Sequence, residues 1–233
     1  MMKKKMMASL LVGSAVVGAS LAPLSAQAVT TGNTPVQVEF GGGVLPDQDN
    51  NVGSTTAPEP GTPNTDFDLL AIPKVISFVS SKIGEDVSAI KQGGIGRNFV
   101  HIGDVRGTKE GWHLTAEIPQ MINGTDKLDG ELNFTMPSYY SEFAVGTDGK
   151  GTYVVSSVAN GQDDPSTPDF IGTNIKLGSG AVTLVNATVG KGQGLWATEL
   201  ENLTLNVTTP YQQIKAGAYT GNITWNLVAG PSI

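Results

Sequence analysis

The side chains best suited to chemistry in this sequence are aromatic and uncharged polar groups at alternate positions of two segments. Trp112 and Leu114 form one Trp-x-Leu pair, and Trp225 and Leu227, preceded by Tyr219, form a second. An aromatic ring can stack on the face of a sugar ring, and amide or hydroxyl groups can bind sugar hydroxyls. Such polar groups alternate with the apolar residues of the second segment, at Thr220, Asn222, Thr224 and Asn226. The aromatic residues could serve such a contact only if their strand face is open to solvent.

The same residues also suit a structural role, because a tryptophan on the apolar face of a strand is usually packed in the core. One hypothesis therefore has the Trp-Leu pairs contacting a ligand. Another has them bracing the fold, while rows of Asn and Thr engage a sugar polymer. The rows also include Asn133, Thr135, Thr204, Asn206 and Thr208. A third interpretation is an ordinary solvated strand surface, in which threonine is favoured by its strand propensity.

Enzyme and metal chemistry find little support in the sequence. The histidines are His101 and His113, there is no cysteine, and no G-x-S-x-G motif is present. Three aspartates lie close together and could mimic a glycosidase pair or a calcium site, but prolines among them favour a solvated turn. These are Asp163, Asp164 and Asp169. We expect no catalytic residue, no metal site and no cofactor.

Composition places the chain among extracellular β-rich modules. It has 233 residues, a formal net charge of -7, 15% charged residues and 30 glycines. Few charges and many glycines favour a turn-rich β protein. The acidic balance argues against nucleic acid as a partner, because a phosphate backbone is bound by clustered Lys and Arg. Without cysteine, disulfides and thiolate chemistry are excluded.

The first 28 residues have the features of a secretory signal peptide. Lys3, Lys4 and Lys5 precede an apolar run that ends near Leu24, and the sequence Ala26-Gln27-Ala28 follows. This order matches the charged, apolar and cleavage regions of a signal, so we predict cleavage after Ala28 and secretion. The alternative is an uncleaved membrane anchor, which the Ala, Ser and Gly content of the run disfavours.

Residues 29–66 are predicted to form a flexible acidic linker. They contain no Lys or Arg, and the stretch from Thr56 to Pro63 is rich in proline. Such a composition favours a solvated, extended chain with local polyproline II structure. The stretch Val36-Gln37-Val38-Glu39-Phe40 is an exception, because its apolar residues alternate and it could dock as a strand.

Residues 67–233 are predicted to form one all-β domain, a β-sandwich of short, mostly antiparallel strands. Alternating segments begin at Phe67, Phe99 and Trp112 and recur towards the last residues, separated by glycine-rich and polar turns. Short strands at such spacing, with little helical pattern, are typical of sandwiches and barrels. The segments 99–106 and 112–118 are expected to form a hairpin.

Two longer motifs resemble a known family. Val105-Arg106-Gly107-Thr108-Lys109-Glu110-Gly111-Trp112-His113-Leu114-Thr115-Ala116 resembles the proximal motif of the WxL cell-wall-binding domain of Gram-positive bacteria. Gly217-Ala218-Tyr219-Thr220-Gly221-Asn222-Ile223-Thr224-Trp225-Asn226-Leu227 resembles its distal motif. The order of signal peptide, acidic linker, proximal motif and distal motif is also similar. The tail Val228-Ala229-Gly230-Pro231 departs from the more polar ending expected there.

The resemblance implies non-covalent attachment to peptidoglycan at the cell surface. It also implies a surface complex with other WxL proteins and a membrane-anchored WxL-interacting protein. An alternative function is an assembly subunit or adhesin, whose main ligand is a partner surface protein or a host extracellular matrix protein. No sorting motif with a hydrophobic tail is seen near the last residues, so we expect non-covalent attachment under either function.

Overall fold

The computed structural model describes residues 33–49, 52–94, 96–157 and 163–232. The chain divides into two compact units, residues 1–38 and 39–233. The first is described at residues 33–38, which hold no regular secondary structure, and the predicted signal peptide lies outside the described residues. In the described part of the chain, no helix is long and apolar enough to span a membrane.

The second unit is built from strands, which alternate with turns along the chain. The first strands are β1 (Thr55–Thr56), β2 (Phe67–Pro73), β3 (Ile90–Lys91), β4 (Phe99–Asp104), β5 (Trp112–Glu117), β6 (Met121–Asn123), β7 (Asp126–Leu128) and β8 (Gly130–Thr135). The later elements are β9 (Ser138–Val145), β10 (Gly151–Val155), β11 (Asp169–Phe170), β12 (Asn174–Lys176), β13 (Val182–Ala187), β14 (Gly194–Glu199), β15 (Glu201–Val207), the 3-10 turn η2 (Tyr211–Gln213) and β16 (Thr224–Ala229).

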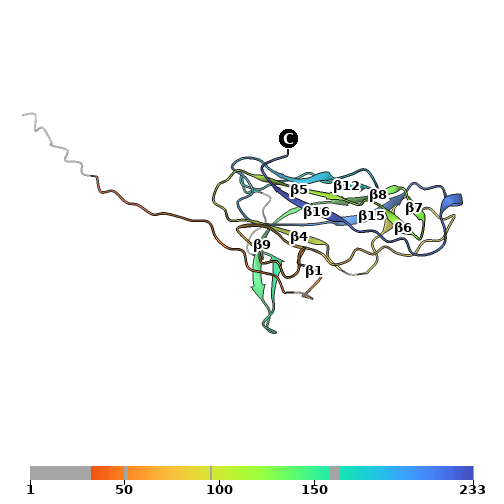
Figure 1. Cartoon of the computed structure of the whole chain (residues 1–233), viewed down its shortest axis with the longest axis horizontal. Coiled ribbons are helices and arrows are strands. Elements are labelled where there is room, and N and C mark those ends of the chain that lie inside the picture. Colours follow the sequence, from red (N-terminus) through yellow and green to blue (C-terminus); the bar gives the residue numbers. More distant parts are fainter. Residues whose placement is uncertain (1–32, 50–51, 95, 158–162, 233) are drawn as a thin grey trace, which may run out of the picture. The chain divides into compact units, whose positions relative to one another are not determined.

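The strands form two layers that confirm the predicted all-β sandwich. One layer joins the six-stranded sheet β1-β2-β4-β14-β9-β10 to the four-stranded sheet β12-β8-β15-β3, because β8 runs on into β9 and β14 into β15. The other layer is the sheet β11-β13-β5-β16, and β6 pairs with β7. All these pairings are antiparallel. Figure 1 shows β5 and β16 side by side, with β4 and β9 below them.

The core lies between the layers and draws on the inward residues of both. It includes Trp112 and Leu114 from β5, Ile102 from β4, Trp196 from β14 and Leu205 from β15. Successive side chains of a strand point to opposite faces, so apolar residues at every second position gather on one face. That face of each strand supplies the core. Burial of such apolar area is the main contribution that holds the layers together.

The predicted hairpin of segments 99–106 and 112–118 is wrong. β4 pairs with β2 and β14, whereas β5 pairs with β13 and β16 in the other layer. The connection between them crosses from one layer to the other and is held by Arg106, whose guanidinium forms a bidentate ion pair with Asp104. Local spacing suggested a turn, but the apolar faces of the two strands are buried against each other across the core.

The described residues of the stretch 43–66, which are 43–49 and 52–66, also differ from the flexible linker predicted for residues 29–66. Leu45 is 3% exposed and packs with Leu70 and Tyr153, and β1 pairs with the end of β2. The backbone N–H of Gly43 donates to the carbonyl of Val105. A low apolar content did not prevent packing, because single apolar residues and backbone hydrogen bonds hold this stretch.

Burial of His101 in β4 predicts a stability that depends on pH. The side chain is fully buried, its Nδ1 lies 2.7 Å from Ser141 Oγ, and its Nε2 has no partner in the described part of the chain. Burial lowers the pKa of His101 from 6.5 to about 4. Between these values the unfolded chain binds more protons, so stability should fall as pH drops from 6.5 towards 4, by on the order of 3 kcal/mol.

Urea denaturation of the wild type and of His101→Gln at pH 7 and pH 4 measures this effect. Glutamine does not titrate, so the variant should lose less stability between the two pH values than the wild type does. The carboxylates titrate in both proteins and cancel in the comparison. Equal losses in the two proteins would contradict a buried neutral His101.

Candidate functional site

The fold brings the two Trp-x-Leu pairs together on neighbouring strands. β16 pairs with β5 so that Leu227 lies opposite Leu114, Ala229 opposite Trp112, and Trp225 opposite Ala116. All of these side chains share the inner face of the sheet, because residues directly opposite in a pair point the same way. The two leucines therefore meet, while the two tryptophans lie at opposite ends of the paired segment.

Trp112 is part of the core. Its side chain is fully buried, and its indole N–H donates to the carbonyl of Gly192 at 3.0 Å. Gly192 has φ of +79°, and a Cβ there would lie 2.5 Å from the indole nitrogen, so the contact requires glycine. Leu114 is equally buried. In this arrangement the proximal motif presents neither side chain to solvent.

Trp225 lies in a different environment. It is half-buried, as are Leu227 and Tyr219, and it packs against the margin of the core. The indole N–H of Trp196, like that of Trp112, donates to a backbone carbonyl. No residue in the described part of the chain accepts a hydrogen bond from the indole N–H of Trp225. This ring therefore offers both a partly open face and a free donor.

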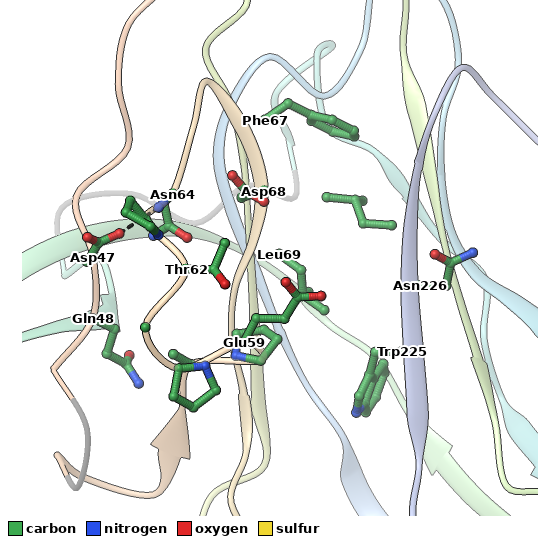
Figure 2. Close-up of a pocket in the computed structure, with 16 residues that line it drawn as sticks. Asp47, Gln48, Glu59, Thr62, Asn64, Phe67, Asp68, Leu69, Trp225 and Asn226 are labelled. Atoms are coloured by element: carbon green, nitrogen blue, oxygen red, sulfur yellow. Dashed lines mark hydrogen bonds between the residues drawn. The ribbon is translucent and has the colours of Figure 1, made fainter.

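A groove with a volume of about 450 Å³ lies between the distal motif and the proline-rich stretch 57–64. We call it the polar groove. One wall is β16 and the other is the proline-rich loop with β2, as Figure 2 shows. Its lining residues are Asp47, Gln48, Ala57, Pro58, Glu59, Pro60, Gly61, Thr62, Pro63, Asn64, Phe67, Asp68, Leu69, Trp225, Asn226 and Leu227.

Hydrogen bonds hold the loop side of the polar groove in place. The Asp47 carboxylate accepts from the backbone N–H of Asn64 at 2.6 Å, and Asp68 accepts from the backbone N–H and hydroxyl of Thr65. Glu59 is exposed, and its carboxylate has no partner in the described residues. In Figure 2, Glu59 and Thr62 extend from the loop into the space that faces β16. The groove thus combines fixed acceptors with one free carboxylate.

Arg106 connects the proximal motif to the end of the polar groove. Its guanidinium carbon lies 3.8 Å from the centre of the Phe67 ring, and its Nη2 donates to the carbonyl of Gly111. Hydrogen bonds to Asp104 raise the pKa of Arg106 above its ordinary value, so the charge is fixed. Gly111 has φ of +81°, and a Cβ there would lie 2.2 Å from the Ala187 carbonyl oxygen. This part of the motif positions a wall of the groove.

The outer edge of β16 carries backbone groups that have no partner among the described residues. The N–H of Gly230 donates to the carbonyl of Gly111, in the register of the β16–β5 pair. Because antiparallel pairs alternate, residues 224, 226 and 228 point their backbone groups at β5, while Trp225 and Leu227 point theirs outward. β16 is the last strand of its sheet in the described part of the chain. Ligand groups in the polar groove can reach these donors and acceptors.

A second groove of about 340 Å³ begins on the other side of Trp225. We call it the apolar groove, because aliphatic and aromatic side chains dominate its walls. Its lining residues are Thr56, Ile72, Pro73, Lys74, Val75, Ile76, Phe78, Ile118, Met121, Leu132, Gly221, Asn222, Ile223 and Trp225. Trp225 lines both grooves and so divides a polar site from an apolar one.

Comparison with known proteins identifies the family. Residues 27–231 match the family model described as WxL domain surface cell wall-binding. The chain belongs to the WxL family. No curated protein and no solved structure matches it significantly. The family description makes this WxL protein a cell-surface protein that binds the cell wall.

The polar residues of the distal motif are exposed in this WxL domain but do not form one row. Thr224 and Asn226 lie on β16 and face away from the core, opposite Glu117 and Thr115 of β5. Thr220 pairs with Ile122, and Asn222 lines the apolar groove. In the other predicted row, Asn133, Thr135, Thr204 and Asn206 lie on β8 and β15, and Thr208 directly follows β15. A polymer contact on either surface stays a prediction.

Two of the three aspartates that suggested metal or enzyme chemistry, Asp164 and Asp169, have structural partners. Asp164 accepts from Tyr140 and Ser166, and Asp169 forms an ion pair with Lys191 at 2.8 Å. These contacts fix turns of the WxL domain.

Sequence reasoning did not place the proline-rich loop at the site. Prolines, acidic residues and few apolar side chains are typical of a linker, and only the position of Leu45 among polar neighbours signals a packed segment. The match to the WxL family model begins at residue 27 and so includes this stretch. The loop supplies one wall of the polar groove and its free carboxylate.

Proposed function

We propose that this WxL protein is secreted and attaches non-covalently to peptidoglycan through the polar groove. The observation that carries the proposal is the half-buried Trp225, with a free indole N–H, opposite a wall of carboxylate, amide and hydroxyl groups. A sugar ring has an apolar face for stacking and hydroxyl groups that need hydrogen-bond partners. Trp225 supplies the first and the loop supplies the second.

The groove also suits the peptide part of peptidoglycan. The outward backbone groups of Trp225 and Leu227 can pair with an extended peptide, as a strand added to a sheet edge does. The Glu59 carboxylate can accept from hydroxyl, amide or amino groups, and charge-assisted bonds of this kind are the stronger ones. Glycan and peptide groups can therefore be bound together along one groove.

Sedimentation with protein-free peptidoglycan tests the proposal. The protein from Val29 onward should pellet with it, and the double variant Glu59→Ala, Thr62→Ala should bind roughly tenfold more weakly, because hydrogen bonds to charged groups contribute about 1.5–3 kcal/mol. Both residues are exposed, so the thermal unfolding temperature should stay close to that of the wild type.

The matched control is Thr108→Ala, Glu142→Ala, which removes an exposed hydroxyl and an exposed carboxylate outside the groove. It should bind like the wild type. If Thr224→Ala, at an exposed residue that does not line the groove, loses binding while the groove variant keeps it, the ligand lies on the outer face of β16 and the groove assignment fails. If the wild type pellets only when a partner protein is added, direct binding to peptidoglycan fails.

A further inference from the structure

The segment Val36–Phe40 has the features of a strand without a partner. Its apolar residues alternate with Gln37 and Glu39 and are exposed, Val36 by 93%, Val38 by 72% and Phe40 by 88%. Exposed large apolar side chains on one face of an extended segment are unfavourable in water and mark interaction sites. Gly41 and Gly42 follow, and Gly43 is fixed by its hydrogen bond to Val105.

The apolar groove has the features of an acceptor for such a segment. Ile72, Ile76, Phe78 and Ile223 give it an apolar lining, and Val75 on its wall is 75% exposed. Residues 75–76 on one side and 222–223 on the other form no backbone hydrogen bonds with the described part of the chain. An added strand can therefore place apolar side chains in the groove and pair its backbone with a wall.

Charge also matches between the segment and the groove. Lys74 is the only charged residue that lines the apolar groove among the described residues, and its Nζ donates to the carbonyl of Gly53. Glu39 is the only charged residue in Val36–Phe40, and it is exposed. An opposite charge on each surface favours their encounter and fixes their register.

The occupant that fits best comes from a second molecule. Gly42 lies near Asp66 and Arg106, beside the Phe67 end of the polar groove. Phe40 belongs to the same compact unit as the apolar groove, yet its side chain is 88% exposed and does not line that groove. A segment from another copy can supply the apolar side chains that its own segment leaves in solvent.

We propose that the apolar groove binds the Val36–Phe40 segment of a second copy of this chain as an added strand. The segment and the groove are different surfaces of the chain, so the contact is heterologous and repeats from copy to copy. Copies then assemble head to tail, while the polar groove of each copy stays available for the cell wall. The assembly does not require peptidoglycan, so it can be tested separately from wall binding.

Sedimentation velocity of the chain from Val29 onward, without peptidoglycan, tests the proposal. The wild type should form species larger than a monomer that grow between low and high micromolar concentration. Val38→Asp disables the Val36–Phe40 segment and Val75→Asp disables the apolar groove, so each variant alone should be monomeric. Mixed in equal amounts, the two variants should form a dimer that grows no further. The intact segment of Val75→Asp can bind the intact groove of Val38→Asp, and no second pair of intact surfaces remains.

Two controls separate the proposal from a general loss of solubility or folding. Val189 is exposed by the same 75% as Val75 but lies outside the groove, so Val189→Asp should assemble like the wild type. Glu39→Lys and Lys74→Glu should each weaken assembly several-fold, and the double exchange should restore it. A monomeric wild type at all concentrations, as expected if the segment binds in its own molecule, would overturn the proposal. So would a monomeric mixture, or assembly of either aspartate variant alone.

Discussion

Trp112→Ala should lower the free energy of unfolding by about 4 kcal/mol, measured by urea denaturation. The ring is fully buried between the layers, and removal of a buried Trp costs about 3–5 kcal/mol through lost contacts and the cavity left behind. The Gly192 carbonyl also loses its donor in a buried position. Since a domain is stable by only about 5–15 kcal/mol, this single change should remove a large share.

Trp112→Phe serves as the partner variant for this measurement. Phenylalanine keeps most of the apolar volume and removes the indole N–H, so it should cost about 1–3 kcal/mol, mainly for the unpaired carbonyl. Wall binding by the folded fraction should be unchanged in both variants. If Trp112→Ala instead unfolds like the wild type and loses wall binding, Trp112 contacts the ligand and its place in the core is refuted.

Alternation of apolar and polar residues was sufficient to predict the fold class and the face of most strands. In the distal segment, half-buried Ile223, Trp225 and Leu227 alternate with exposed Thr224 and Asn226, as the period of two predicts. The period is a local property of the chain, so it can be read from one segment. It does not say where pairing begins, and the regular strand starts only at Thr224.

Strand partners could not be predicted in the same way, because they depend on contacts between distant segments. Trp112 in β5 and Phe99 in β4 begin neighbouring strands in the sequence, but the strands belong to different layers. The crossing is fixed by the ion pair of Arg106 with Asp104 and the contact of Arg106 with Phe67. None of these pairs is visible as a periodic pattern.

The difference between the two motif tryptophans was also hidden in the sequence. Trp112 and Trp225 are each followed by a leucine two residues later and lie on the same side of the sheet. What separates them is the covering layer, because β5 is an inner strand and β16 is the last strand of its sheet in the part of the chain that the structure describes. The proline-rich loop then approaches Trp225 without closing over it. Exposure of a motif residue is thus decided by strand order.

Trp225→Ala should weaken binding to protein-free peptidoglycan by roughly 30- to 150-fold, as measured by sedimentation. An aromatic ring that is covered on binding contributes about 2–3 kcal/mol through its buried apolar area and stacking, which corresponds to that change in affinity. The ring is only half-buried in the free protein, so the variant should lose no more than about 2 kcal/mol of unfolding free energy.

Trp225→Phe separates stacking from hydrogen bonding at this position. It keeps an aromatic face and removes the free indole N–H, so binding should be intermediate between the wild type and Trp225→Ala. Trp112→Phe is the matched control, because it makes the same chemical change at a buried ring that should not contact the ligand. Wild-type affinity in folded Trp225→Ala would show that the ring only packs the fold, and the ligand would then have to be sought outside the polar groove.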